Sequence, residues 1–339
     1  MLKRFTTFFC LFTVSTIYSQ LGGESTYQFL NLVSSPRQAA LGGKVITNYD
    51  YDVTGAIYNP ATINDEMDNQ LALNYTSYLG GISYGTGAYA YTWDRRVQTF
   101  HMGVTYINYG DFDGYDENGV STGSFSGNEA AISFGYARQI GYSDFYFGAN
   151  VKFITSKLEQ YNSIGAAVDL GVIYIDEDLG FHAALTVRNA GAQLKTYAGQ
   201  NENLPLEVNL GLSQQLENVP LRWHLTFENL QEWPIGVSNP ARATTDLEGN
   251  QTQEKVGFFN QVLRHTIVAA ELFPDRGFNL RLGYNFRRSE ELRIEDQRNF
   301  SGLSFGVGLK LNKLRFSYTH ARYTSASNTN FLGLQIDLR

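Results

Sequence analysis

The sequence predicts an all-β fold, a transmembrane β-barrel of about fourteen antiparallel strands that follows an N-terminal plug. Three observations support this prediction: apolar and polar residues alternate, short and long connections alternate, and the chain starts with an export-type segment. The stretch LSFGVGLKLNKLRFSYTH, residues 303–320, illustrates the first observation, because every second residue on either side of Asn312-Lys313 is apolar. A period of two predicts paired strands with one apolar and one polar face.

The first residues, MLKRFTTFFCLFTVSTIYSQ, have the order of a secretory signal peptide. Lys3 and Arg4 precede an apolar run over 5–17, and the small and polar residues that follow predict cleavage near Ser19-Gln20. The apolar run is too short to cross a bilayer as a helix. We therefore assign residues 1–19 to a signal peptide and expect the mature chain in the outer membrane of a Gram-negative bacterium.

Composition limits the function classes that remain. Without Lys3 and Arg4 the chain keeps 24 basic and 33 acidic residues, a net charge of −9, which makes it a poor candidate for nucleic-acid binding. The only cysteine, Cys10, lies in the predicted signal peptide, so we expect no disulfide and no cysteine metal site in the mature chain.

The alternating segments fill the chain from residue 70 to its end. Their approximate limits are 70–78, 81–92, 97–107, 128–139, 143–155, 160–176, 179–189, 205–217, 221–230, 263–273, 277–287, 301–311, 313–320 and 329–338. Most have the nine to eleven residues or more that a tilted membrane strand needs. An even number of strands permits closure without an exposed edge.

The connections decide what the apolar faces contact. Periodicity alone leaves open a soluble sandwich, in which the apolar face would meet a second sheet. Short connections such as 94–96, 177–178 and 312–313 alternate with long ones such as 108–127 and 231–262. Bacterial barrels keep tight turns on the periplasmic side and long loops outside, so we expect the apolar faces to contact lipid and both termini to lie on the periplasmic side.

Residues 20–69 do not alternate and predict a plug ahead of the barrel at 70–339. Ser35-Pro36 and Asn59-Pro60 both have the pattern of a helix N-cap followed by proline. The polar strand faces carry Lys152, Arg222, Arg281 and Arg315, which would line the lumen. We expect this wall to pair with carboxylates of the plug, namely Asp50, Asp52, Asp65, Glu66 and Asp68. A path for a polar solute is the alternative interpretation of the lumen charges.

No catalytic, cofactor or metal site is predicted. The five histidines have no metal-ligand spacing, and Gly-rich pieces such as 85–87 lie within strands rather than before a helix. The acidic stretch 111–118 lacks the spaced glutamate of an EF-hand loop. We therefore expect a protein without enzymatic activity.

The loop over 231–262 is long for a compact barrel and needs a reason. It places Trp233, Phe258 and Phe259 among polar residues. Aromatic anchors in polar surroundings suit a protein contact, and we take these three residues as candidate partner-binding residues. The alternative is a variable loop without a partner.

Two N-terminal stretches, YQFLNLVSSPRQAALGG (27–43) and YDYDVTGAIYNPATI (49–63), precede a barrel that runs to the last residue. In this arrangement the chain resembles the FadL-like outer-membrane proteins of Bacteroidetes and, among them, the PorV/PorQ group of the type IX secretion system. The most specific positions are Arg37, Leu41, Gly42, Gly43, Asn59, Pro60 and Ala61. Leu-Gly-Gly stands where PorV members usually have Met-Gly-Asp, which favours the PorQ members.

The resemblance implies a non-enzymatic part of a cell-surface attachment complex with PorU, PorV and PorZ. That complex removes sorting domains from secreted cargo and joins the cargo to anionic lipopolysaccharide, with the sortase chemistry in PorU. The barrel would hold a PorZ-like surface protein at the membrane. The alternative function is a FadL-type transporter of hydrophobic compounds, which should have an apolar pocket between plug and wall.

Overall fold

The structure is a computed structural model that describes residues 25–94, 98–236, 244–245, 251–252, 256–292, 300–323 and 328–339. The predicted signal peptide lies outside these residues, as do the turn at 95–97 and most of 237–255. Among the described helices, none has both the length and the hydropathy of a membrane span.

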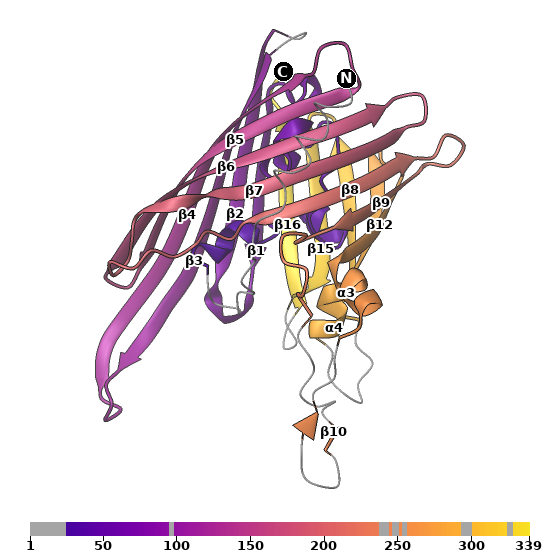
Figure 1. The fold of residues 1–339 in the computed structure, drawn as a ribbon. Helices are drawn as coiled ribbons and strands as arrows, with labels where there is room; N and C mark the ends of the chain where they lie inside the picture. Colours follow the sequence, from indigo (N-terminus) through magenta and orange to yellow (C-terminus); the bar gives the residue numbers. More distant parts are fainter. Residues whose placement is uncertain are drawn as a thin grey trace, which may run out of the picture.

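Fourteen antiparallel strands close into a barrel (Figure 1). The strands are β1 (Gln70–Ser77), β2 (Ser83–Asp94), β3 (Gln98–Tyr115), β4 (Ser121–Gln139), β5 (Phe145–Leu158), β6 (Tyr161–Asp176), β7 (Phe181–Lys195), β8 (Glu207–Gln215), β9 (Leu221–Phe227), β12 (Thr266–Leu272), β13 (Phe278–Asn285), β14 (Leu303–Leu311), β15 (Leu314–Arg322) and β16 (Asn328–Asp337). Neighbours in sequence pair throughout, and β16 pairs with β1 from Gln70↔Asp337 to Ser77↔Asn330, which closes the barrel. The predicted fold class is confirmed, and each of the fourteen predicted segments corresponds to one strand.

The predicted loop at 108–127 is wrong in its extent. β3 and β4 continue as a paired ribbon to Tyr115 and Ser121, and only 116–120 connect them. The ribbon is exposed on both sides, and its pairing register shifts between Asn108 and Asp111. Strand pairing beyond the lipid-facing part has no apolar face to bury, so hydrophobic periodicity does not report it.

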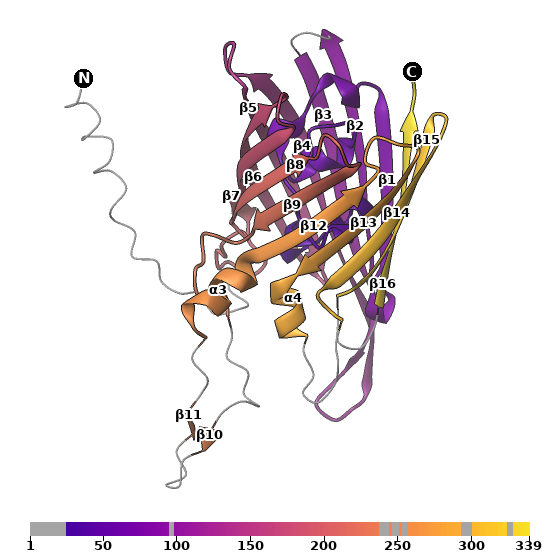
Figure 2. The ribbon, with the colours of Figure 1, turned by 90° about the vertical axis from the view of Figure 1, so that its right-hand side faces the viewer.

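Two helices lie where predicted connections meet predicted strands, and they replace the predicted strand ends at 263–265 and 286–287. α3 (Phe258–His265) runs directly into β12, and α4 (Phe286–Glu291) follows β13, capped by the Asn285 side chain that accepts from the Arg288 amide. Both helices lie together at the end of the barrel opposite the C-terminus, where the long connections gather (Figures 1 and 2). A small hairpin in this region pairs β10 (Thr244–Thr245) with β11 (Gln251–Thr252).

The outward faces of the strands are apolar, as predicted. On β13, Phe278 and Leu282 are about half exposed, at 49% and 51%, whereas Asn279 and Arg281 between them are each 5% exposed. Exposed aromatic and aliphatic side chains on the outside, with buried charges on the inside, are the arrangement of a barrel in lipid.

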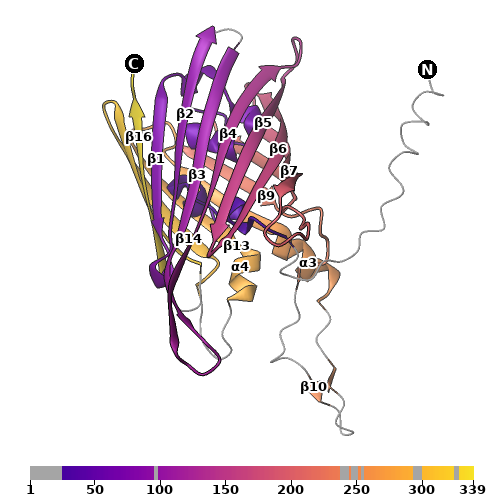
Figure 3. The same cartoon turned by 90° about the vertical axis from the view of Figure 1, so that its left-hand side faces the viewer.

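The lumen is filled by residues 25–69, which form a short α-helix and four single-turn 3-10 helices (Figure 3). These are η2 (Gln28–Asn31), α2 (Pro36–Ala40), η3 (Val53–Ile57), η4 (Pro60–Thr62) and η5 (Asp65–Met67). Ser35 and Asn59 are the N-cap residues of α2 and η4, as predicted, and the Asn59 side chain accepts from the Ala61 amide at 2.9 Å.

Glycines of the wall let this segment approach closely. A Cβ at Gly283 would lie 2.2 Å from the Leu41 carbonyl carbon, and one at Gly148 would lie 2.3 Å from the Pro60 carbonyl carbon. Backbone therefore packs on backbone at both positions, which a larger residue would prevent.

Candidate functional site

Arg37 is the centre of the contacts between plug and wall. Its guanidinium donates two hydrogen bonds to the Glu271 carboxylate of β12, both at 2.9 Å, and two to the Asp50 carboxylate of the plug, at 2.9 and 2.8 Å. Asp52 lies 3.6 Å away. Arg37 is 4% exposed and Glu271 is fully buried. A bidentate arrangement to both carboxylates fixes the orientation of α2 against the wall.

Wall residues complete this cluster. Arg281 donates to Glu271 at 2.9 Å, and Arg222 donates to Asp50 at 3.2 Å. Burial opposes ionisation of Asp50, but Arg37 and Arg222 outweigh it and hold the pKa of this carboxyl well below its usual range. For Asp52 burial outweighs Arg37, and its pKa is raised.

A second buried cluster joins the plug to strands β7 and β8 of the wall, which follow β12 and β9 around the barrel. Lys44 of the plug lies 2.6 Å from Glu207 of β8, and Glu207 also accepts from Arg188 of β7. Nearby, Lys152 of β5 pairs with Asp169 of β6 at 2.7 Å. Lys44 and Arg37 thus bring cations of the plug onto carboxylates of the wall.

The predicted lumen residues divide among these clusters. Arg222 meets the plug carboxylate Asp50, whereas Lys152 and Arg281 pair with carboxylates of the wall itself. The Arg315 guanidinium lies over the ring of Tyr51 in the plug, 3.4 Å from its centroid. Of the remaining predicted plug carboxylates, Asp68 accepts from the Thr92 amide, and Asp65 and Glu66 are exposed. Sequence reasoning missed Lys44, which no pattern in the plug distinguishes.

The residues of the N-terminal motif hold the plug's own backbone. Asn59 donates through Nδ2 to the Ile46 carbonyl at 2.7 Å while its oxygen caps η4 before Pro60 and Ala61. Leu41 is fully buried, and Gly42 ends α2 with a φ of 85°. A Cβ at Gly43 would lie 2.5 Å from a methyl group of Ile267. These residues pack against the wall or cap a helix, and they offer no reactive group.

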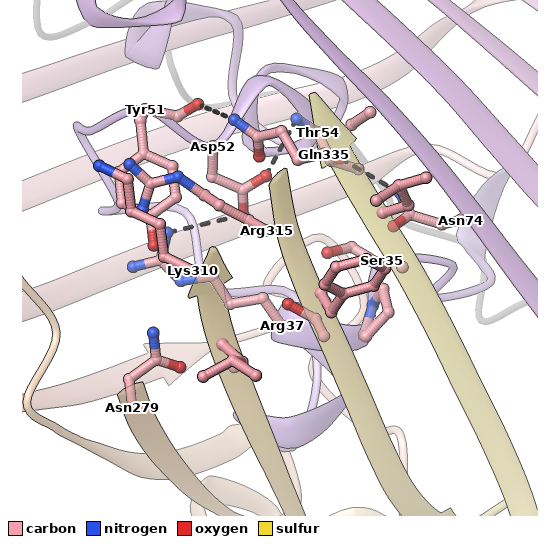
Figure 4. A pocket seen from close by; sticks show the side chains of 18 of the residues that line it. Ser35, Arg37, Tyr51, Asp52, Thr54, Asn74, Asn279, Lys310, Arg315 and Gln335 are labelled. Atoms are coloured by element: carbon pink, nitrogen blue, oxygen red, sulfur yellow. Dashed lines mark hydrogen bonds and ion pairs between the residues drawn. The ribbon is translucent and has the colours of Figure 1, made fainter. Parts of the chain in front are cut away.

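The plug leaves small cavities against the wall. One has a volume of about 40 Å³ and lies between the plug and strands β13 to β16 and β1 (Figure 4). Another of about 10 Å³ lies beside Tyr58 and Arg188. Ligand pockets usually have volumes of roughly 300–1,000 Å³. A third, apolar hollow of about 740 Å³ lies on the outer surface of the wall, over Leu73, Val307, Phe316 and Leu332.

The three candidate partner-binding residues come together at the end of the barrel opposite the C-terminus. The Trp233 and Phe258 ring centroids are 5.7 Å apart, and those of Phe258 and Phe259 are 5.9 Å apart. Their exposed fractions are 44%, 64% and 82%, respectively. We call these three residues the aromatic cluster.

The polar side of α3 fixes the aromatic cluster. Gln261 accepts from the Gly236 amide at 3.0 Å, and both ring nitrogens of His265 contact carbonyl oxygens, those of Glu228 and Trp233. The His265 ring also stacks on Trp233 with centroids 5.0 Å apart. The helix therefore buries its polar face and exposes its aromatic one.

The histidines do not form a common site. His101 contacts the Val53 carbonyl and His182 the Thr47 carbonyl, while His224 lies 3.4 Å from Glu271. Within the described ranges, no group of three or more His, Cys, Asp or Glu side chains has the arrangement of a metal site.

No protein-family model matches the chain, and no curated protein matches it. Its fold is similar to that of the toluene transporter TbuX of Ralstonia pickettii, at 14% identity over 91% of this chain and 99% of that one, with a TM-score of 0.54. A FadL homologue of Pseudomonas aeruginosa covers the same shares at 10% identity, with a TM-score of 0.47. On the similarity to TbuX, the chain has the fold of a FadL-like outer-membrane barrel.

Proposed function

We propose that this protein is a plugged, non-enzymatic outer-membrane barrel that anchors a protein at the cell surface. The observation that carries the proposal is the filling of the lumen. Arg37 and Lys44 tie the plug to strands β12 and β8 of the wall through buried carboxylates, and the two cavities described between plug and wall hold about 40 and 10 Å³. Water fits such spaces, but an apolar solute does not.

The outer end offers a surface for the anchored protein. Trp233, Phe258 and Phe259 are exposed together. Phe258 and Phe259 lie on α3, which Gln261 and His265 connect to the segment at Trp233 and Gly236. Rigid, clustered aromatic side chains are typical centres of protein interfaces, because they bury a large area at a small cost in conformational entropy.

The identity of the partner rests on the sequence resemblance alone. The positions from Arg37 to Ala61 resemble those of the PorQ members of the type IX secretion system, and a PorQ-like barrel would hold a PorZ-like protein, with PorU and PorV as further components. In this role the barrel supports removal of sorting domains and attachment of cargo to anionic lipopolysaccharide without chemistry of its own.

The second candidate function is transport of hydrophobic compounds. Two observations favour it: the similarity in fold to the toluene transporter TbuX, and the apolar hollow on the outer wall. The hollow and the 40 Å³ cavity inside share part of their lining, so a single layer of strands separates the two. The shared residues are Asn74, Gly308, Leu309, Phe316, Ser317, Gly333 and Leu334. A transporter would have to open that wall or move the plug.

One pair of measurements separates the two functions. The barrel is purified from native membranes through an affinity tag, and a deletion strain is compared with its complemented parent. An anchor co-purifies with a surface protein, which the deletion strain releases into the medium, and uptake of toluene is the same in both strains. A transporter keeps the surface protein in place and loses toluene uptake on deletion, a result that would refute the anchor.

A further inference from the structure

The 40 Å³ cavity has a strongly cationic lining (Figure 4). Four cationic side chains line it, against the single carboxylate of Asp52. They are Arg37, Arg281, Lys310 and Arg315. Arg37 is already engaged by Asp50 and Glu271, but in the described part of the chain no carboxylate lies within 4.0 Å of the Lys310 or Arg315 head group.

The two cations that no described carboxylate approaches, Lys310 and Arg315, lie on neighbouring strands. Lys310 of β14 and Arg315 of β15 are directly opposed in the pairing register. Like charges in this position repel and destabilise the sheet. The ring of Tyr51 holds the Arg315 guanidinium in place by a cation–π contact, and Figure 4 shows Lys310, Arg315 and Tyr51 gathered at one side of the cavity.

Deeper in the cavity, a buried donor has no acceptor. The Arg281 side chain is 3% exposed, and its Nε donates to Glu271, yet its Nη1 has no hydrogen-bond partner. Asn279, 5% exposed on the same strand, also lines the cavity and leaves its side-chain oxygen unpaired. A buried guanidinium nitrogen without an acceptor is unfavourable, so an acceptor next to Arg281 Nη1 is strongly favoured.

The cavity is reached from the short-turn end of the barrel. Lys310 and Arg315 stand next to the turn at Asn312-Lys313, and Lys310 is exposed. In a bacterial barrel this end faces the periplasm. A ligand would therefore meet Lys310 and Arg315 first and Arg281 last.

We propose that this cavity is a binding site for a small oxyanion, a phosphate or carboxylate group that enters from the periplasm. The ligand oxygens accept from Arg281 Nη1 and from the head groups of Lys310 and Arg315, and the negative charge relieves the repulsion between the two opposed cations. Guanidinium groups favour oxyanions because their donors match the spacing of paired oxygens. The inference is independent of whether the barrel anchors a protein or transports a solute.

The test is calorimetric titration of the purified, detergent-solubilised barrel with inorganic phosphate and, separately, with acetate at constant ionic strength. We expect one saturable site for at least one of the two anions. Lys310→Gln combined with Arg315→Gln should weaken binding by about tenfold or more, because each removes a charged hydrogen-bond donor. Lys313→Gln, in the adjacent turn and outside the cavity lining, is the matched control and should leave binding unchanged.

Asp52→Asn tests the site in the opposite direction. It removes the one carboxylate of the lining while asparagine still caps η3, where the Asp52 side chain accepts from the Thr54 amide at 3.1 Å. Phosphate or acetate should bind more tightly to this variant, a gain that loss of folding cannot produce. The proposal is overturned if neither anion shows a saturable site, if the double variant binds as the parent does, or if Asp52→Asn leaves the affinity unchanged.

Discussion

Arg37 and Glu271 are 234 positions apart in the chain and share two parallel hydrogen bonds of 2.9 Å inside the barrel. The same guanidinium grips Asp50, so a single side chain of the plug connects two carboxylates that belong to different parts of the fold. Removal of Arg37 would leave Glu271 with Arg281 and Asp50 with Arg222, and would remove the one cation that joins the two carboxylates. Replacing Arg37 alone, with its carboxylate partners kept, should therefore destabilise the packing of the plug against the wall.

Arg37→Gln is expected to loosen the plug. Loss of one partner from a buried ion pair typically costs about 3–5 kcal/mol when the other charge stays uncompensated. Arg281 and Arg222 still pair with Glu271 and Asp50, so we expect a cost below this range. We expect a lower temperature of conversion in heat-modifiability gels and measurable ion conductance of the variant in planar bilayers, where the parent barrel stays closed.

Arg287→Gln is the matched control for this change. Arg287 pairs with Glu291 on α4 at 2.7 Å, but the two side chains are 34% and 38% exposed. Exposed pairs of this kind contribute about 0–1 kcal/mol, so stability and conductance should match those of the parent. Equal conductance of Arg37→Gln and Arg287→Gln would contradict a plug held through Arg37.

The orientation in the membrane can be tested with single cysteines. Asp116 lies in the exposed turn at the tip of the β3–β4 ribbon, and Asn312 lies in the two-residue turn at the other end of the barrel. Asp116→Cys should react with an impermeant maleimide in intact cells, and Asn312→Cys only after the outer membrane is opened. Asp246→Cys, outside the described residues, should behave as Asp116→Cys does. The reverse labelling pattern would invert the topology.

The last strand allows a test of membrane depth. Leu332 is 54% exposed at the middle of β16, whereas Ile336 lies near its periplasmic end opposite Leu71 and Leu314. A lysine at mid-membrane costs about 2–4 kcal/mol and less near the interface. Leu332→Lys should therefore reduce the amount of inserted barrel more than Ile336→Lys, and Asp337→Asn should not reduce it. Equal membrane levels of all three variants would refute a lipid-facing β16.

The barrel was predictable because the alternation of apolar and polar residues identifies the lipid-facing and lumen-facing sides of each strand. Phe278 and Asn279 are neighbours in sequence, yet Phe278 is exposed on the outer face of the wall and Asn279 is buried on the inner face. Alternation alone therefore distinguishes lipid-facing from lumen-facing residues. The same logic fails beyond the lipid-facing part, where the ribbon near Asp113 is exposed on both sides. It also fails for α3, whose buried side is the polar one, with Gln261 and His265.

The contacts of the plug could be predicted only as a class. Charges on the inner face required opposite charges in the lumen, and Arg222 with Asp50 meets that expectation. No local pattern, however, says that Arg37 reaches Glu271 or that Lys44 reaches Glu207, since those distances along the chain exceed any periodicity. The closed barrel decides which cation of the plug pairs with which carboxylate of the wall, because it places residues from remote parts of the chain side by side in the lumen.

The aromatic cluster provides the sharpest test of the anchor function. Trp233, Phe258 and Phe259 are packed on one another and remain exposed, so a partner can bury them without rearranging the barrel. Truncating a buried aromatic anchor typically costs about 2 kcal/mol or more, roughly thirtyfold in affinity. Phe259→Ala should release a PorZ-like protein into the medium while the barrel stays heat-modifiable and in the outer membrane.

Shortening the loop behind the aromatic cluster extends this test to the remainder of the loop. Replacing 236–256 by a short Gly/Ser linker should spare folding, because loop closure depends weakly on length, and should also release the surface protein. The linker removes the Gly236 amide that Gln261 accepts from, so a second variant that keeps Gly236 and replaces only 237–255 shows whether the position of α3 matters. Phe305→Ala, an equally aromatic change on the lipid-facing side of β14, is the control and should retain the partner. If Phe259→Ala and both shortened barrels keep the surface protein and its cargo fully attached, the dock lies elsewhere, and the tip of the β3–β4 ribbon around Asp116 becomes the next surface to change.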